Sequence, residues 1–430
     1  MILFRWMVFL VTFLVVGGGA GSLAESLAPS SKSLASRVHQ YLDARDGEEA
    51  EELLQTILSS EQASIKAVSY IIKEGRPYQS QPTGILPSEQ IVVRGQTYPL
   101  SLFVPESYET AKRYALVVCL HGFGFTGEEY LERWRTRLGE DYLLACPTYP
   151  SGAWFTRRAE ELVLETIQDV TRRYHIDPDR VFLTGMSNGG IGAWLIGMHH
   201  APLFAGIAPM ASGLDDVLMP FLANLRHTPI YIIHGSKDQV MPAHLSRSIT
   251  KELDALSYPY VYREHEREHP IAGGHYFPKE ELPDLIAWFD HQRRQSLPRS
   301  VTLVRDASHF QPFTWVRLDA TDPIAAFSDD LVDKGDEQIK RRVYARLDAS
   351  IREGNRIEVQ TDHVRRYSLF VNDSLIDPAK PVTVITNGEV SFAGTVMPSV
   401  ETLLRQTRLR QDTQRLLTIH LSITVPTPDP

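Results

Sequence analysis

A serine flanked by glycines, at the junction of a predicted strand and a predicted helix, has the chemistry of a nucleophile. Residues 181–190 read Val-Phe-Leu-Thr-Gly-Met-Ser-Asn-Gly-Gly, so Ser187 lies in a Gly-x-Ser-x-Gly pattern directly after an apolar run. A sharp turn at this point lifts the hydroxyl above the sheet, and glycines on both sides tolerate the crowded backbone. The pattern alone arises often by chance, but its place between strand and helix predicts a nucleophilic serine.

Two backbone N–H groups are predicted to stabilise the oxyanion that attack by such a serine creates. Asn188 stands at the start of the predicted helix, where N–H groups are free and positively polarised. The second donor is expected from Phe123, because His121-Gly122-Phe123-Gly124 directly follows the most apolar strand of the chain. The alternative interpretation of this run is a glycine-rich turn that only closes the strand.

A serine is a weak nucleophile at neutral pH, so a base must take its proton and an acid must orient that base. Asp238 follows the apolar strand 229–233 in a loop. Ligand sites of parallel sheets lie at this carboxyl edge, which makes Asp238 the predicted acid. Asp215 and Asp216, after the preceding strand, are the competing acids.

His275 is the predicted base, because it follows two glycines, after the next strand and just before a terminal helix. The glycines let an exposed imidazole approach the serine. His265 and His269 compete for this role, but they lie in a run of charged residues that is typical of a solvated surface. His121 and His234 each precede a glycine at a strand end, and we interpret them as residues that shape loops.

No cofactor and no metal is expected. Cys119 and Cys146 are the two cysteines, too few for a disulfide framework or a cysteine-rich zinc site. The pairs His199-His200 and His265/His269 lack the His-Glu-x-x-His pattern of a zinc helix.

Four aromatic residues near these motifs are predicted to line a pocket for an aromatic acyl or alcohol group. The alternative is that each belongs to the core. They are Phe125, Tyr149, Trp154 and Tyr276.

The motifs lie within residues 90–295, where strands alternate with helices of ten or more residues. Apolar runs such as 116–120 and 230–233 resemble strands that helices cover on both faces. This alternation predicts an α/β domain with a mostly parallel sheet flanked by helices. The predicted strands are 98–104, 115–120, 142–145, 181–184, 206–210, 229–233 and 260–264.

The chain start has the layout of a secretory signal peptide. Residues 6–16 carry no charge, Arg5 precedes them, and small residues follow up to a plausible cleavage site at Ser22-Leu23-Ala24. This run is shorter than the roughly 20 residues of a spanning helix. We therefore predict a signal peptide at residues 1–24 and a secreted or periplasmic protein; an uncleaved membrane anchor is the alternative.

Residues 31–75 are predicted to form three short amphipathic helices that pack against the main domain. Residues 46–49 and 59–62 resemble capping boxes, and Gly75 suits a C-terminal cap. A linker rich in Pro, Gln and Ser is expected at residues 76–88.

Residues 300–426 have a β-rich pattern and predict a separate β-sandwich-like module. Asn387-Gly388 between two β-type runs predicts a tight hairpin. One helix is expected from Val400 to about Leu417, followed by a last strand. The module carries no catalytic pattern. Its expected role is to contact a protein or polysaccharide partner, or to stabilise the chain. Fragment 26–298, which lacks the module, is expected to fold alone.

The composition is that of a globular protein, with 43% hydrophobic and 23% charged residues. Lys and Arg number 44 against 53 Asp and Glu, which gives a formal charge of −9. This balance repels phosphates over much of the surface, so nucleic acid is not an expected partner.

Taken together, the ordered motifs at His121, Ser187, Asp238 and His275 resemble the α/β-hydrolase superfamily. Residues 177–190 look like the polyhydroxybutyrate depolymerase and feruloyl esterase branch, and also like dienelactone hydrolases and prolyl-oligopeptidase catalytic domains. The depolymerases usually carry disulfides and an aromatic-rich surface, whereas this chain has two cysteines. The departure argues against polymer degradation.

The resemblance covers residues 90–295. It implies an exported carboxylesterase that acts on a small or oligomeric ester substrate, with Ser187 as nucleophile, His275 as base, Asp238 as its orienting acid, and Phe123 and Asn188 as oxyanion donors. A serine peptidase of the prolyl-oligopeptidase kind and a non-catalytic binding protein on the same scaffold are the alternatives.

Overall fold

The computed structural model describes residues 33–426, so the predicted signal peptide, residues 1–24, lies outside the described part. The described residues from Leu34 onward form one compact unit. Within the described range, no helix combines the length and the apolar character that crossing a membrane requires.

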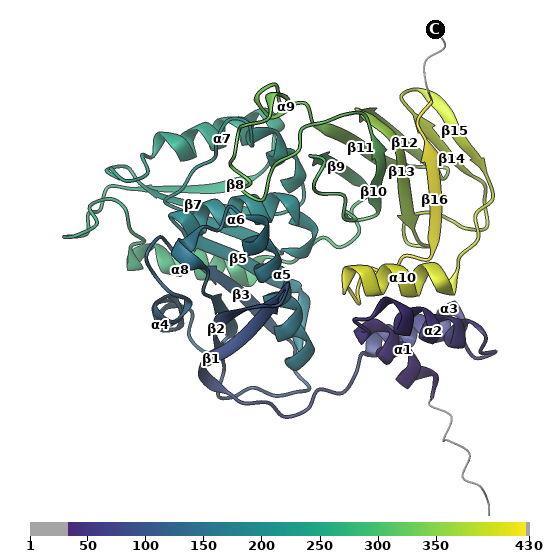
Figure 1. Cartoon of the computed structure of the whole chain (residues 1–430), viewed down its shortest axis with the longest axis horizontal. Helices are drawn as coiled ribbons and strands as arrows, with labels where there is room; N and C mark the ends of the chain where they lie inside the picture. Colours follow the sequence, from purple (N-terminus) through teal and green to yellow (C-terminus); the bar gives the residue numbers. More distant parts are fainter. Residues whose placement is uncertain (1–32, 427–430) are drawn as a thin grey trace, which may run out of the picture. The chain divides into compact units, whose positions relative to one another are not determined.

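A mixed sheet of eight strands, in the order β1-β2-β4-β3-β5-β6-β7-β8, organises residues 84–294, here called the sheet domain (Figure 1). β2 is antiparallel to both β1 and β4, and the remaining neighbours are parallel, which confirms the predicted sheet. The strands are β1(Gly84–Val93), β2(Gln96–Val104), β3(Tyr114–Leu120), β4(Tyr142–Pro147), β5(Ile176–Met186), β6(Gly206–Met210), β7(Ile230–Gly235) and β8(Tyr260–His265).

The edge strand β1 was not expected, because residues 76–88 were assigned to a linker. β1 begins at Gly84 and pairs with β2, with a shift of register between Leu86 and Glu89. Pro87 lies inside this irregularity. Proline cannot donate to a neighbouring strand and is confined to edge strands and bulges, so a strand with this composition is hard to recognise in a sequence.

Helices cover both faces of the sheet. Successive side chains of β3 point to opposite faces and pack with different helices. Leu116 and Val118 pack with α5, α6 and α7, whereas Val117 and Cys119 pack with α4 and α8. The helices are α4(Gly127–Leu138), α5(Arg157–Arg173), α6(Asn188–His199), α7(His244–Leu256) and α8(Leu282–His291), with short 3-10 turns η1(Pro150–Gly152), η2(Ala201–Leu203), η3(Met219–Leu225) and η4(Lys279–Glu281). Cys119 and Cys146 are buried free thiols on adjacent strands.

The C-terminal module, residues 300–426, contains a five-stranded sheet, β15-β14-β12-β11-β9, and a three-stranded sheet, β10-β13-β16. The predicted hairpin is present: Asn387 and Gly388 have positive φ and join β14 to β15. The elements are β9(Ser300–Arg305), β10(Val316–Thr321), α9(Glu337–Lys340), β11(Ala345–Arg352), β12(Arg356–Asp362), β13(Val364–Val371), β14(Val382–Thr386), β15(Glu389–Gly394), α10(Val400–Arg410) and β16(Ile419–Thr424). β11 was not predicted, and α10 ends at Arg410 rather than near Leu417.

The three predicted helices are present as α1(Leu34–Asp43), α2(Gly47–Leu58) and α3(Ile65–Glu74). Asp46 caps α2 and Gly75 follows α3 as predicted, but Ser59 ends α2, and Ser64 is the residue that caps α3. The apolar faces of these helices form a cluster with Leu403 and Leu404 of α10. Their main packing partner is therefore the C-terminal module, and not the sheet domain as expected.

The C-terminal module shares a hydrophobic core with the sheet domain, so the expectation of a separate module is wrong. Val301 and Leu303 of β9 belong to the same buried cluster as Phe221 of η3. Beside them, the Asn224 side chain accepts from the Val304 N–H at 2.7 Å and donates to the Val304 carbonyl at 3.1 Å. Sequence pattern shows that a strand has an apolar face but not which element covers that face.

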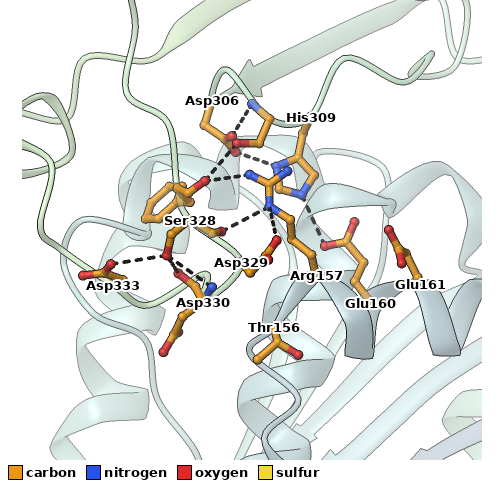
Figure 2. A network of polar contacts seen from close by, with 12 residues as sticks. Thr156, Arg157, Glu160, Glu161, Asp306, His309, Ser328, Asp329, Asp330 and Asp333 are labelled. Carbon is orange, nitrogen blue, oxygen red and sulfur yellow. Dashed lines mark hydrogen bonds and ion pairs between the residues drawn. The ribbon is translucent and has the colours of Figure 1, made fainter. Parts of the chain in front are cut away.

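Polar contacts reinforce this junction, as Figure 2 shows. Arg157 of α5 donates to the carbonyl oxygens of Phe327 and Ser328, at 2.6 and 3.1 Å. Deeper in the junction, His309 lies 2.6 Å from Asp306 and 3.3 Å from Glu160 of α5. The contacts join the two parts through buried ionisable groups.

Candidate active site

Ser187 lies in a strained turn between β5 and α6, with φ 59° and ψ −124°. Two glycines make this turn sterically allowed: a Cβ at Gly185 would lie 2.2 Å from the Gly189 carbonyl oxygen, and a Cβ at Gly189 would lie 2.1 Å from the Leu120 carbonyl oxygen. Strained backbone of this kind is typical of functional sites. Within residues 33–426 the Ser187 hydroxyl makes no hydrogen bond.

The loop that follows β3 lies beside this serine, since a Cβ at Gly122 would be 3.5 Å from the Ser187 Cβ. Neither the Phe123 N–H nor the Asn188 N–H donates to another described residue. Asn188 is the first residue of α6, where a helix leaves its N–H groups without an internal acceptor. Both predicted donors are therefore free to bind an oxyanion.

His121 holds the loop in shape, in agreement with its predicted role. Its Nδ1–H donates to the Gly122 carbonyl at 2.9 Å, and its Nε2 accepts from the Tyr149 N–H at 3.1 Å. Burial lowers the pKa of His121, which favours the neutral ring that these bonds require. Trp154 donates from Nε1 to the His121 carbonyl at 2.8 Å and is 0% exposed. Trp154 thus belongs to the core and does not line an open pocket, contrary to expectation.

Asp238 and His275 meet at the carboxyl edge of the sheet. Nδ1 of His275 lies 2.7 Å from Oδ2 of Asp238. The other carboxylate oxygen, Oδ1, accepts from the N–H groups of Val240 and Met241 at 2.9 Å each. Burial opposes ionisation of Asp238, but hydrogen bonds from His234 and His275 outweigh it and hold its pKa well below the ordinary value. Asp238 is therefore an oriented anion.

Two glycines let the histidine loop pack against the acid loop. A Cβ at Gly274 would lie 2.4 Å from the Asp238 nitrogen, and a Cβ at Gly235 would lie 2.1 Å from the Gly274 carbonyl oxygen. Only glycine fits at both positions. The Gly-Gly-His pattern that selected His275 in the sequence thus has a steric cause.

His234 is a second imidazole at the same acid, and the sequence did not indicate this contact. Its Nε2 lies 2.6 Å from the Met241 carbonyl oxygen and 3.4 Å from Oδ2 of Asp238. Because a carbonyl only accepts, Nε2 carries the proton. Nδ1 lies 2.7 Å from the Ser246 hydroxyl, which fixes the ring. His234 shapes the loop as predicted, and it also contacts the carboxylate.

The competing acids lie elsewhere in the hydrogen-bond network. Asp215 pairs with Lys334, and Asp216 lies 3.1 Å from Arg342, both partners being in the C-terminal module. These aspartates therefore join the sheet domain to the module.

The competing histidines make no contact with Asp238. His265 is buried and lies 3.2 Å from the Tyr276 carbonyl oxygen, while the backbone of His269 pairs with that of Gly273. Both shape the segment that carries His275.

Three of the four predicted pocket aromatics remain at or near the surface. Phe125 is 38% exposed and packs on Tyr130, and Tyr276, partly buried, follows His275. Tyr149 stacks on Tyr98 with ring centroids 5.6 Å apart and is partly buried in the core. Of the predicted pocket residues, Phe125 and Tyr276 lie on the loops that carry the site, whereas Tyr149 packs against the core.

Glu160, His199 and His309 each offer one ligand atom, all within 4.8 Å of one another, a group that could hold a metal ion. The rings of His199 and His309 stack with centroids 3.8 Å apart. Burial lowers the pKa of His309, but hydrogen bonds to Asp306 and Glu160 outweigh it and raise that pKa to about 9. When protonated, the His309 ring donates from Nδ1 to Asp306 and from Nε2 to Glu160.

The known proteins that resemble this chain match it over about half of its length. No family model matches the chain. Acyl-protein thioesterase 1 of Gibberella zeae is 26% identical over 226 residues, which is 43% of this chain and 92% of the thioesterase. The sheet order, the strained serine turn and this relative agree. Residues 84–294 have the α/β-hydrolase fold and resemble that superfamily.

Solved structures similar to this chain include a thermostable esterase, with 25% identity and a TM-score of 0.43 over 49% of this chain. The chain spans 63% of the length of that esterase. A ferulic acid esterase is 15% identical, with a TM-score of 0.38 over 48% of this chain and 96% of its own length.

Proposed function

We propose that this α/β-hydrolase is an exported carboxylesterase that forms an acyl-enzyme on Ser187. The contact between Asp238 and His275 at 2.7 Å carries the proposal, because it orients the imidazole as a general base needs. The strained turn at Ser187 and the free N–H groups of Phe123 and Asn188 support it. The similarity to an acyl-protein thioesterase supports hydrolysis of an acyl bond.

In the proposed mechanism, Nε2 of His275 takes the Ser187 proton as the hydroxyl attacks the ester carbonyl carbon. The tetrahedral oxyanion accepts hydrogen bonds from the Phe123 and Asn188 N–H groups, and the imidazolium lies against the ionised Asp238. His275 then returns the proton to the leaving alcohol. Water, deprotonated by His275, releases the acid from the acyl-enzyme. Hydrogen bonds between catalytic groups often tighten only when substrate binds, so we propose that the Ser187 hydroxyl then donates to Nε2 of His275.

An apolar acyl group is the proposed substrate feature. Phe123 is 69% exposed, and it shares the loop after β3 with Phe125. Val240, two residues after Asp238, is 67% exposed, and Ile271, four residues before His275, is 91% exposed. Exposed apolar side chains on each of the three loops that carry the site favour an apolar partner. We therefore expect turnover to rise with acyl length.

The test compares the wild type with Ser187→Ala on p-nitrophenyl acetate, butyrate and octanoate, with methyl ferulate, an octanoyl thioester and a peptide anilide in parallel. We expect hydrolysis of oxygen esters that Ser187→Ala lowers about a thousandfold or more, without a change in the melting temperature. The octanoyl thioester tests whether this protein also hydrolyses a thioester, the bond that the name of the fungal relative indicates. Cleavage of the anilide alone would favour a peptidase, and absence of labelling of the folded protein by a fluorophosphonate would favour a binding protein.

The acid assignment has a matched control in the chain. Asp238→Asn should lower kcat/KM by about ten-thousandfold, because the amide stabilises the wrong tautomer of His275. Asp215→Asn, which alters a salt bridge with Lys334, should leave kcat/KM within about twofold of the wild type. The opposite ranking would make Asp215 the acid.

Export is proposed from residues 1–24, with a membrane anchor as the other outcome. The full-length chain, expressed in a secreting host, should appear outside the cytoplasm with a new N-terminus near Glu25. An intact N-terminus in the membrane fraction would show an anchor. An intact N-terminus in the cytoplasm would contradict both.

A further inference from the structure

A cavity of about 310 Å³ lies where the N-terminal helices, α5, the end of α6 and the region of α10 converge. None of its lining residues belongs to the loops that carry Ser187, Asp238 or His275. Its volume is within the range of sites for small organic molecules. Apolar side chains from the N-terminal helices, α5, η2 and α10 form much of its wall: Leu42, Ile72, Leu164, Ile167, Leu203 and Leu409.

The charged side chains of this cavity are mostly cationic, although the chain as a whole carries a formal charge of −9. Four arginines line it, namely Arg76, Arg172, Arg410 and Arg415. Asp43 is the one carboxylate among the lining residues and pairs with Arg76, and Arg172 lies 3.7 Å from Asp169, so the excess charge comes from Arg410 and Arg415. The cavity therefore combines an apolar wall with an excess of positive charge.

The buried charges behind this wall do not balance. Arg294 is buried and pairs with Asp179 and Asp412, at 2.8 Å each, and Arg415 lies 3.6 Å from the same Asp412. Arg410 has no acidic partner. Three guanidinium groups thus face two carboxylates, which leaves one net positive charge (3 − 2 = 1).

Arg410 is the guanidinium of this set without a carboxylate within ion-pair distance, and its Cζ lies 5.6 Å from the centroid of the Phe370 ring. Its Nη1 and Nη2 are shielded from solvent and make no hydrogen bond, while its Nε donates to Gln406 at 3.2 Å. Burial, and then the charge of Arg415, lower the pKa of Arg410 to about 9. A buried charge without a partner is strongly destabilising, so a bound anion at this point would stabilise the fold.

We propose that this cavity binds a monocarboxylate with an apolar tail, of the medium-chain fatty-acid class, whose carboxylate pairs with Arg410. One negative charge matches the excess of one positive charge. Because Nη1 and Nη2 of Arg410 are shielded from solvent, the proposal includes a turn of this side chain toward the cavity, where a planar carboxylate accepts two parallel hydrogen bonds from a guanidinium. The tail lies along Leu164 and Ile167 of α5. A neutral amphiphile would leave Arg410 unpaired, and a short anion would leave the apolar wall uncovered. The site does not depend on the catalytic role of Ser187.

Isothermal titration of the full-length protein with decanoate tests the proposal, with decanol and acetate as comparison ligands. We expect saturable binding of decanoate at least tenfold tighter than that of either comparison ligand. Arg410→Gln should weaken decanoate binding at least tenfold and remove the preference over decanol. Arg405→Gln is the matched control, because Arg405 is an exposed arginine of the same helix that pairs with Glu401 and does not line the cavity.

A second variant separates this cavity from the catalytic site, where a carboxylate product could also bind. Ile167→Trp fills the cavity from α5 and should abolish the tight decanoate site, while Ser187→Ala should leave it unchanged. Decanoate should also raise the melting temperature of the wild type, since it binds only the folded state. No saturable binding, or binding that folded Arg410→Gln and Ile167→Trp proteins both retain in full, would overturn the proposal.

Discussion

Nε2 of the fully buried His234 lies 3.4 Å from Oδ2 of Asp238, the same oxygen that lies 2.7 Å from His275. Two imidazole rings thus contact the same carboxylate oxygen. The His234 ring is fully buried, and the His275 ring lies at the site. His234 is itself fixed by the Met241 carbonyl and the Ser246 hydroxyl. The fixed ring and the N–H groups of the acid loop leave the carboxylate little freedom to turn away from His275.

His234 should therefore act as a positioning residue for Asp238. A hydrogen bond to a charged group contributes about 1.5–3 kcal/mol, so His234→Leu should lower kcat roughly ten- to hundredfold with little change in KM. His234→Gln, whose amide nitrogen can occupy the place of Nε2, should retain more activity than His234→Asn. Steady-state kinetics on a soluble ester, beside melting curves, measures this. An equal loss of activity in the Leu, Gln and Asn variants would indicate that His234 acts through packing alone. The same substitutions at His244, which is exposed, are the control.

The turn at Ser187 should not tolerate a methyl group at Gly189. A Cβ there would lie 2.1 Å from the Leu120 carbonyl oxygen, so Gly189→Ala must move either α6 or β3. Overpacking of this kind costs about 1–3 kcal/mol. We expect a lower melting temperature, and a loss of activity larger than the loss of folded protein, because the Asn188 N–H moves with α6. Gly47→Ala, where no atom lies within 4 Å, should be neutral in both assays.

The local part of the site could be predicted from the sequence. Ser187 and Asp238 each follow a strand with a strong apolar pattern. The glycines beside Ser187 and His275 reflect steric demands that short motifs record. The sheet was predictable for the same reason, except for β1, where Pro87 masks the strand pattern.

Contacts between distant positions could not be predicted. Trp154 resembled a pocket residue, but its partner is the His121 carbonyl, 33 residues away. Arg410 and Arg294 lie far apart in the chain, and their shared environment exists only in the folded protein. The pattern of β9 likewise showed an apolar face without showing that Phe221 covers it.

Stability should fall at alkaline pH because of His309. Its pKa in the folded protein is raised to about 9, above the ordinary value near 6.5. Protonation therefore favours folding, and the contribution is complete below about pH 6.5 and is lost as the pH rises through 9. It amounts to at most about 3 kcal/mol.

Urea unfolding at pH 6, 7.5 and 9.5 measures this contribution. His309→Gln should be less stable than the wild type at pH 6, and its free energy of unfolding should change less between pH 6 and 9.5. His363→Gln, at a histidine that is 38% exposed, should retain the wild-type dependence. A parallel pH dependence in His309→Gln would show that other groups are responsible.

Removal of the C-terminal module should unfold the sheet domain. A chain that ends at Pro298 loses the apolar cover of Phe221, leaves the buried Asn224 amide without both of its bonds to Val304, and leaves Arg294 without Asp412. Each unpaired buried group adds a penalty to the exposed core. We expect fragment 26–298 to be insoluble or to lack a cooperative melting transition, whereas the sequence pattern suggested an independent fold. A soluble fragment that melts cooperatively and hydrolyses p-nitrophenyl butyrate would show instead that the shared core is dispensable, because the sheet and its own helices would then hold the Asp238–His275 pair and the Ser187 turn without help.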